Sequence, residues 1–262
     1  MLNEKLETFL KKKWILPTAA AVVVTAAVIV FLASGRKPVS GADTGPVSEG
    51  VAYLESLEAR DIKEIEKQVK AVEKEARAQA IANGELSVWA QFSDYVIFGD
   101  SRTVGFYFYE FLGSDRVLAE GGLTIADIPT YLDRMVALNP AHLFLCTGLN
   151  DVSIGNWNTP EEYVAAYEET VQNLKEKLPD THIYINSIFP AQDPAFEQSE
   201  AWRRIPEYNV ALQAWCAEKG YSYIDNTNVY EEHSDLYDPD GIHFQREFYE
   251  YWAVNMLAEV EV

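Results

Sequence analysis

Five short apolar runs separated by helical segments dominate this chain from residue 95 onward. Such short runs suit strands that are buried on both faces. The helical segments between them carry clear end signals, such as Thr159 before Pro160–Leu178 and Gly220 after Pro206–Lys219. This alternation predicts an α/β protein, a flavodoxin-like three-layer α/β/α sandwich with a five-stranded parallel sheet. The expected strands are Tyr95–Phe98, Val117–Ala119, Leu143–Cys146, Ile183–Asn186 and Tyr223–Ile224.

The first 37 residues differ in composition from the rest of the chain. Four lysines within residues 1–13 precede an uncharged stretch from Trp14 to Ala33, and Arg36 and Lys37 follow it. As a helix, residues 14–33 would be about 30 Å long, which matches the hydrocarbon thickness of a bilayer. We therefore expect residues 1–13 to be a cytoplasmic basic tail and residues 14–33 to be a transmembrane signal anchor. This single-pass anchor places the remainder of the chain outside a bacterial cell membrane. A cleaved secretory signal peptide is the alternative, since the same features serve both.

Two connecting segments separate the expected anchor from the first strand. Residues 34–48 are rich in glycine and proline, which predicts a flexible linker. In residues 49–84, apolar side chains such as Ile62, Ile65 and Val69 recur at helical spacing, which predicts a helical stalk. The remaining residues, 85–262, form the expected folded domain.

The part of the chain after residue 37 is strongly acidic. Of 21 basic and 41 acidic residues, 6 and 2 lie in the first 37, which leaves 15 basic and 39 acidic residues and a net charge of −24. So negative a domain repels nucleic acid, which we do not expect as a partner, and favours a neutral or cationic substrate. The alternative is that this charge serves solubility alone.

No residue pattern points to a metal or to another cofactor. Cys146 lies in an expected strand and Cys216 in an expected helix, so both are expected to be buried apolar side chains without a disulfide. Neither Cys-x-x-Cys pairs nor clustered histidines occur. We therefore expect no cofactor, and the sequence leaves the oligomeric state open.

The first apolar run ends in Gly99-Asp100-Ser101 and leads directly into a helical pattern. A serine in this turn lies at the carboxyl edge of the sheet, where open α/β folds have their sites. A serine nucleophile needs a base within hydrogen-bond reach, and histidine is the usual one.

Only one of the four histidines is well placed to be that base. His142 and His182 each precede an expected strand and so lie at the opposite edge, while His233 lies in an acidic polar loop. His243 follows Asp240 by three residues in a turn, so the carboxylate can reach its ring. His243 is therefore the best candidate base.

Four short blocks occur in a fixed order along the chain. They are Gly-Asp-Ser ending at Ser101, a glycine at Gly122, Gly-x-Asn-Asp with Asn150, and Asp-x-x-His ending at His243. In this order they resemble the blocks of the SGNH (GDSL-type) hydrolase family, over roughly residues 94–260.

The resemblance implies a serine esterase with a catalytic triad of Ser101, Asp240 and His243. It also implies an oxyanion hole made by the backbone N–H groups of Ser101 and Gly122 and by the side-chain amide of Asn150. Gly121 is an alternative to Gly122, because this block matches least closely.

Four further side chains are candidates for contact with the substrate: Arg102, Tyr107, Trp157 and Trp202. Aromatic rings can stack on a sugar, although packing is their more common role. Arg102 takes the position where Gly-Asp-Ser-Leu members have leucine, and pairing with an acid is the alternative to substrate contact.

Together these features predict a membrane-anchored extracytoplasmic serine ester hydrolase. We expect it to remove O-acetyl or other small acyl groups from carbohydrate through an acyl-enzyme. Its expected partners are a small acyl ester or acylated glycan and, through the N-terminal helix, the cell membrane. An O-acyltransferase that uses the same site is one alternative. A non-catalytic surface binding module is another, and the complete set of site residues argues against it.

Overall fold

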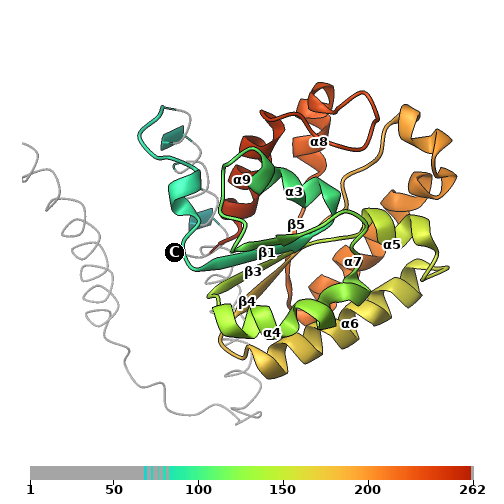
Figure 1. Cartoon of the computed structure of the whole chain (residues 1–262), viewed down its shortest axis with the longest axis horizontal. Coiled ribbons are helices and arrows are strands. Elements are labelled where there is room, and N and C mark those ends of the chain that lie inside the picture. Colours follow the sequence, from blue (N-terminus) through green and yellow to red (C-terminus); the bar gives the residue numbers. More distant parts are fainter. Residues whose placement is uncertain (1–67, 70–71, 73–75, 77–78, 81–82, 261–262) are drawn as a thin grey trace, which may run out of the picture. The chain divides into compact units, whose positions relative to one another are not determined.

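The computed structural model describes residues 83–260 and, before them, residues 68–69, 72, 76 and 79–80 (Figure 1). These earlier residues are helical. The basic tail, signal anchor and linker expected in residues 1–48 lie outside the described residues, as does most of the expected stalk. Within the described part of the chain, no helix has both the length and the apolar character needed to cross a membrane.

Five parallel strands form one sheet, as the sequence predicts, and their order in the sheet is β2-β1-β3-β4-β5. Three strands begin one residue earlier than expected. His142 and His182 belong to β3 and β4 and are partners in the sheet register, because backbone pairing does not require an apolar side chain. The strands are β1 Tyr95–Gly99, β2 Val117–Ala119, β3 His142–Cys146, β4 His182–Asn186 and β5 Ser222–Ile224.

The strands are apolar because both faces of the sheet are buried. In β1, Val96 and Phe98 pack in one core, while Tyr95 and Ile97 pack in the other. Consecutive side chains of a strand point to opposite faces, so a strand covered on both sides has no position for an unpaired polar side chain.

Helices cover both faces of the sheet and complete the three expected layers (Figure 1). Helices α4, α5, α6 and α7 bury side chains in the first core, and α3, α8 and α9 bury theirs in the second. The helices are α3 Ser101–Phe108, α4 Ile128–Leu138, α5 Leu149–Ile154, α6 Pro160–Lys177, α7 Ile205–Lys219, α8 Thr227–His233 and α9 Phe248–Ala258. Short 3₁₀ turns are η1 Trp89–Gln91, η2 Ile125–Asp127, η3 Asp193–Glu197, η4 Glu200–Arg204 and η5 Ser234–Leu236.

Helices α6 and α7 begin and end close to their sequence signals. The Thr159 hydroxyl accepts the N–H of Glu162 at 3.2 Å and so caps α6. Helix α7 ends at Gly220, whose φ of 73° lies in the left-handed region that glycine adopts without strain.

The strand order places a reversal between β1 and β3. Strand β2 lies on one side of β1, whereas β3, β4 and β5 lie on the other. In open α/β sheets, ligands bind outside the carboxyl ends of the strands at such a reversal. Ser101 follows β1 and Gly148 follows β3, so the segments that carry the candidate site meet there.

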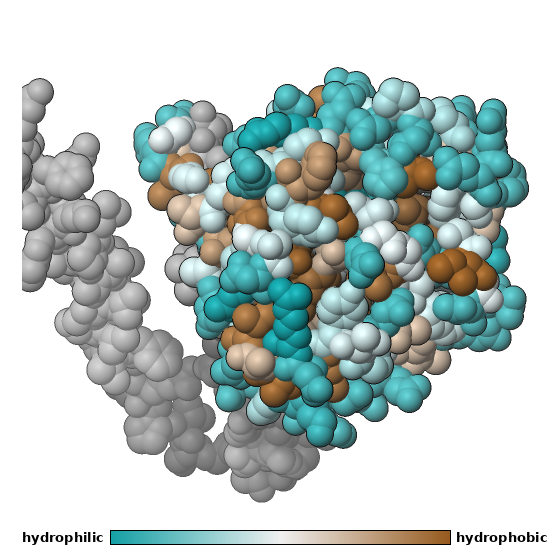
Figure 2. Space-filling view, viewed as in Figure 1, coloured by the Kyte–Doolittle hydropathy of each residue, from teal (hydrophilic) through white to brown (hydrophobic). Residues whose placement is uncertain are grey.

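The surface seen in Figure 2 is mostly hydrophilic. Polar residues cover most of this face, and the apolar residues form small separate groups. Isolated apolar residues of this kind are normal on a water-exposed surface.

Candidate active site

Ser101 lies in the sharp turn between β1 and α3. A Cβ on Gly99 would overlap the Thr103 side chain, so this strand must end in glycine. Asp100 caps α3, since its Oδ1 accepts the N–H of Arg102 at 3.0 Å. Ser101 is therefore the first residue of the helix, where its own N–H has no partner within the helix.

His243 is carried by a tight loop whose ends, Tyr237 and Phe244, form an isolated antiparallel bridge. Inside the loop, the N–H of Asp238 donates to the carbonyl of His243 at 2.8 Å. Gly241 has a φ of 71°, in the left-handed region that favours glycine. The backbone of the loop thus fixes the position of the histidine.

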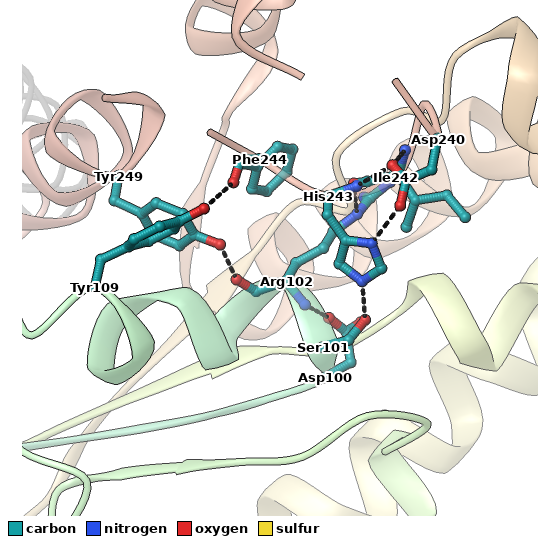
Figure 3. Close-up of polar contacts among 9 residues, drawn as sticks. All are labelled: Asp100, Ser101, Arg102, Tyr109, Asp240, Ile242, His243, Phe244 and Tyr249. Atoms are coloured by element: carbon teal, nitrogen blue, oxygen red, sulfur yellow. Dashed lines mark hydrogen bonds and ion pairs between the residues drawn. The ribbon is translucent and has the colours of Figure 1, made fainter. Parts of the chain in front are cut away.

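Asp240 binds both the backbone and the ring of His243. Its Oδ1 accepts the N–H groups of Ile242 at 2.8 Å and His243 at 2.9 Å, and its Oδ2 lies 2.6 Å from His243 Nδ1. On the other side of the ring, Nε2 lies 2.9 Å from Ser101 Oγ (Figure 3). The three residues proposed as the triad therefore form one hydrogen-bonded chain.

The Asp240 carboxyl favours its charged form. Burial raises its pKa, but hydrogen bonds from the His243 ring and from the N–H groups of His243 and Ile242 outweigh burial, so the pKa lies below its usual value. The carboxylate is therefore charged at neutral pH and can stabilise a positive charge on the imidazole.

The other three histidines lie elsewhere in the domain. His142 and His182 begin β3 and β4 at the amino edge of the sheet. His233 ends α8 and stacks on Tyr251, with the ring centroids 3.5 Å apart. Of the four, only His243 has a hydrogen bond to the serine.

Gly122 lies in the loop after β2 and Asn150 in the helix after β3, and these two strands flank β1 on opposite sides. Gly122 has a φ of 88°, in the left-handed region, and Asn150 lies in the first turn of α5. Asn150 Nδ2 donates to the carbonyl of Leu123 at 3.1 Å, which ties the glycine loop to α5 with one amide hydrogen. The second amide hydrogen remains for another acceptor. Gly121, the alternative to Gly122, lines a groove beside Ser101.

Asp151 makes a second link between the glycine loop and α5. Its Oδ1 accepts the N–H of Ile125 at 2.9 Å. The following turn, η2, has a capping box in which Asp127 Oδ2 accepts from both the N–H and the hydroxyl of Thr124, each at 2.8 Å. The segment directly after Gly122 is thus held by hydrogen bonds at Leu123, Thr124 and Ile125.

Two carboxyls next to the motif residues are buried and have raised pKa values. Burial raises the pKa of Asp100 to about 6, although the Arg102 charge opposes this shift. Burial raises the pKa of Asp151 to about 7, although the hydrogen bond from Ile125 opposes it. Both acids are therefore costly to ionise in the folded protein.

Within the described domain, Arg102 is placed neither to contact substrate nor to pair with an acid, the two roles expected from the sequence. Its side chain is buried, and it makes no ion pair among the described residues. Its Nε donates to the carbonyl of Ile242 at 2.9 Å, Nη1 to that of Phe189 at 2.6 Å and Nη2 to that of Pro190 at 3.2 Å. The guanidinium is therefore committed to backbone carbonyls of two loops and is not available to a substrate.

The three aromatic candidates make hydrogen bonds or ring contacts with other residues of the domain. Trp202 is buried, and its Nε1 donates to a backbone carbonyl 2.8 Å away. Trp157 is half-buried and packs edge-on against Tyr163, with centroids 5.6 Å apart. The Tyr107 hydroxyl donates to a backbone carbonyl at 3.4 Å. These contacts favour the packing role over contact with substrate.

An open groove of about 340 Å³ begins at Ser101 and His243 and runs beside α3. Apart from Ser101, Gly121 and His243, its residues were not singled out from the sequence. Val104 and Phe108 follow Ser101 by three and seven positions, so helical spacing was the signal that could have found them. We call it the α3 groove; besides the serine, the histidine and Gly121 it is lined by Val104, Gly105, Phe108, Tyr109, Asp238, Phe244 and Tyr249.

No metal-binding arrangement occurs among the residues that the structure describes. No group of three or more His, Cys, Asp or Glu side chains is close enough together to hold an ion. Cys146 and Cys216 are both free and buried.

The sequence matches the GDSL-like lipase/acylhydrolase family over residues 97–251, a range that contains all four motif blocks. The chain belongs to this family and is a serine esterase of the SGNH type. It has no significant match to a curated protein.

Solved structures share the fold. A lipase/acylhydrolase from Enterococcus faecalis is 19% identical with a TM-score of 0.51, and the match covers 64% of this chain and 95% of that one. A GDSL-like lipase from Bacteroides thetaiotaomicron is 17% identical with a TM-score of 0.52, and the match covers 69% of this chain and 94% of that one.

Proposed function

We propose that the protein hydrolyses small acyl esters, with Ser101 as the nucleophile, His243 as the base and Asp240 as its orienting partner. The observation that carries this proposal is the unbroken hydrogen-bonded chain from Asp240 Oδ2 through the imidazole to Ser101 Oγ. A positioned base of this kind activates a serine that is otherwise a weak nucleophile.

In the proposed reaction, Ser101 Oγ attacks the acyl carbon while its proton moves to His243 Nε2. Hydrogen bonds stabilise the negative charge that develops on the carbonyl oxygen. The N–H groups of Ser101 and Gly122 and the remaining amide hydrogen of Asn150 donate them. The imidazolium then gives its proton to the oxygen of the departing alcohol. Water, activated by the same imidazole, releases the acid from the acyl-enzyme.

We propose O-acetyl or similar small acyl groups on carbohydrate as the substrate class. Two features support this class: the expected position outside the membrane brings the domain to cell-surface glycans, and the α3 groove is open enough to admit the body of a sugar. A panel of acetylated glycans, with released acetate as the readout, tests this assignment.

The test of hydrolysis uses the full chain in detergent with 4-nitrophenyl acetate. We expect turnover by the wild type and loss of turnover in Ser101→Ala and His243→Ala, with unchanged circular dichroism in both variants. Equal turnover by the wild type and Ser101→Ala would remove the serine from the mechanism.

We also propose that residues 14–33 anchor the domain to the membrane as a single-pass helix. The support is the uncharged 20-residue stretch between basic flanks. The full chain should stay with membranes during alkaline carbonate extraction, whereas a truncated chain that begins at Glu49 should remain in the aqueous fraction. Release of the full chain by carbonate would contradict the anchor.

A further inference from the structure

The α3 groove has apolar sides that begin at the proposed catalytic residues. Val104 and Phe108 on α3 form one part of its lining, and Phe244, the residue after His243, forms another. Phe108 is 69% exposed, which is unusual for phenylalanine and leaves its ring free to contact a ligand. The groove is thus suited to a compact apolar group.

The groove lies on the side of the site where the alcohol of an ester leaves. His243 gives its proton to the alcohol oxygen in the proposed reaction, so that oxygen lies next to the imidazole. His243 and Ser101 line the groove, whereas Gly122 and Asn150, two of the three residues assigned to the carbonyl oxygen, do not. The groove therefore receives the alcohol part of the substrate rather than its acyl part.

Two tyrosines in the groove already use their hydroxyl groups (Figure 3). The Tyr109 hydroxyl donates to the carbonyl of Phe244 at 3.3 Å, and that of Tyr249 donates to the carbonyl of Arg102 at 2.7 Å. A Cβ at Gly105 would overlap the Tyr249 ring, so the glycine lets this ring lie against α3. What the tyrosines offer a ligand is aromatic surface, which attracts cations.

Asp238 is the one carboxylate in the lining of the groove. It is half-buried, and within residues 83–260 its carboxylate makes no hydrogen bond or ion pair. Its backbone is fixed, since its N–H donates to the His243 carbonyl at 2.8 Å and its carbonyl accepts from Gly241 at 3.0 Å. The Asp238 carboxylate is therefore held in the groove, where its negative charge can pair with a bound cation.

The surroundings of Asp238 do not neutralise this charge. Burial raises the pKa of Tyr109, and the negative charges of Asp238 and Glu247 raise it further. The Asp238 carboxylate therefore exerts its charge on a residue that lines the groove. Arg246 also lies near Tyr109, but its guanidinium donates to the Tyr109 carbonyl at 3.4 Å and lies 4.4 Å from the centre of the Phe111 ring. No ion pair joins Arg246 to Asp238 in the described domain.

We propose that the α3 groove binds the alcohol part of the ester and that Asp238 selects an alcohol that carries a positively charged nitrogen. This inference rests on the proposed esterase function. A carboxylate at the edge of an aromatic groove binds a cation by direct charge and by the ring faces together. The domain of residues 85–262 has 30 acidic and 9 basic residues, and its negative field attracts the same substrates.

The test compares acetylcholine with 3,3-dimethylbutyl acetate, which has the same acyl group and a neutral alcohol of the same shape. The full chain in detergent should hydrolyse acetylcholine with a kcat/KM about tenfold higher, as a half-buried charge pair allows. In Asp238→Asn this preference should fall to near unity. The matched control Asp235→Asn removes an exposed acid that does not line the groove and should keep the preference of the wild type.

A second pair distinguishes an amino sugar from an amino alcohol as the source of the charge. It consists of 6-O-acetylglucosamine and 6-O-acetylglucose, and the faster of the two cationic esters identifies the source. Equal kcat/KM within both pairs, or a preference that survives in Asp238→Asn, overturns the inference while hydrolysis of 4-nitrophenyl acetate still supports the esterase. Absence of all hydrolysis, including that of 4-nitrophenyl acetate, overturns the esterase function itself and the inference with it.

Discussion

Arg102 Nε donates to the carbonyl of Ile242 at 2.9 Å, so the residue after Ser101 is bonded to the residue before His243. This bond joins the segment of the proposed nucleophile to that of the proposed base through a contact separate from the Ser101–His243 hydrogen bond. The same guanidinium also binds the carbonyls of Phe189 and Pro190 in the loop after β4. Arg102 is thus a positioning residue that holds three segments together.

Replacing Arg102 with leucine, the residue of Gly-Asp-Ser-Leu members, should lower kcat by roughly 10²-fold, because small displacements of reacting groups have effects of this size. KM should change much less, since the guanidinium does not reach the groove. The free energy of unfolding should fall by about 2–4 kcal/mol because three carbonyls lose a donor. Steady-state kinetics and urea denaturation measure the two effects.

Arg203→Leu is the matched control for this variant. Arg203 is exposed, pairs with Glu200 at 2.7 Å and lies over the Phe196 ring at 3.9 Å. Its loss should change stability by about 1 kcal/mol and leave kcat unchanged. Wild-type kcat in Arg102→Leu would show that the Ser101–His243 contact does not depend on the arginine.

Asn150→Ala should lower kcat by about 10²–10³-fold with a smaller effect on KM, because an oxyanion donor acts mainly in the transition state. The variant also removes the bond to the Leu123 carbonyl, so a modest loss of stability is expected. Asn150→Asp serves as a second variant that keeps the size of the side chain and removes its donors. An unfolded domain or full turnover in Asn150→Ala would make Asn150 a residue of the turn alone.

Asp240→Asn should lower kcat by about 10⁴-fold. The asparagine oxygen can still accept the N–H groups of Ile242 and His243, which places the NH₂ group against His243 Nδ1. The ring proton then moves to Nε2, where it faces Ser101 and blocks its deprotonation. The circular dichroism spectrum should be unchanged, and a kcat within tenfold of the wild type would argue against the orienting role.

The pH dependence of stability should reveal the buried acid Asp151. Its pKa is about 7 in the folded protein against an ordinary 3.8, so the folded state holds the proton more tightly than the unfolded state. Its contribution to the free energy of unfolding is complete below pH 4 and is lost as the pH rises to about 7. The loss amounts to a few kcal/mol.

Asp151→Asn keeps an oxygen for the Ile125 N–H and removes this titration. Relative to the wild type, the variant should gain stability between pH 5 and pH 8 in urea denaturation followed by tryptophan fluorescence. Asp240 is the internal contrast: its lowered pKa contributes stability that is lost only as the pH falls through the acid range, and it should do so in both proteins. Parallel pH curves for the two proteins would contradict the raised pKa of Asp151.

The sheet could be predicted from the sequence because each buried strand is a continuous apolar run bounded by turn residues. The contact between Ser101 and His243 was also predictable, because Ser101 follows a strand at the carboxyl edge and the other three histidines precede strands or lie in a polar loop. Local patterns were therefore enough to predict which histidine contacts the serine.

The surroundings of the site could not be predicted in the same way. Arg102 is bonded to carbonyls 87, 88 and 140 residues away, and carbonyls occur at every position, so no residue pattern marks these partners. The α3 groove depends on how the loop of Asp238 packs against α3, which neither segment determines alone. Residues 1–48, where the anchor is expected, lie outside the described part of the chain.

The most direct test of the account is covalent labelling of the full chain with a fluorophosphonate, followed by peptide mass spectrometry. Such a probe forms a stable bond only with a serine whose hydroxyl is activated by a base. The account predicts one adduct, on Ser101, that is absent in Ser101→Ala and forms much more slowly in His243→Ala. An adduct on another residue, or equal labelling of the wild type and His243→Ala, would contradict it.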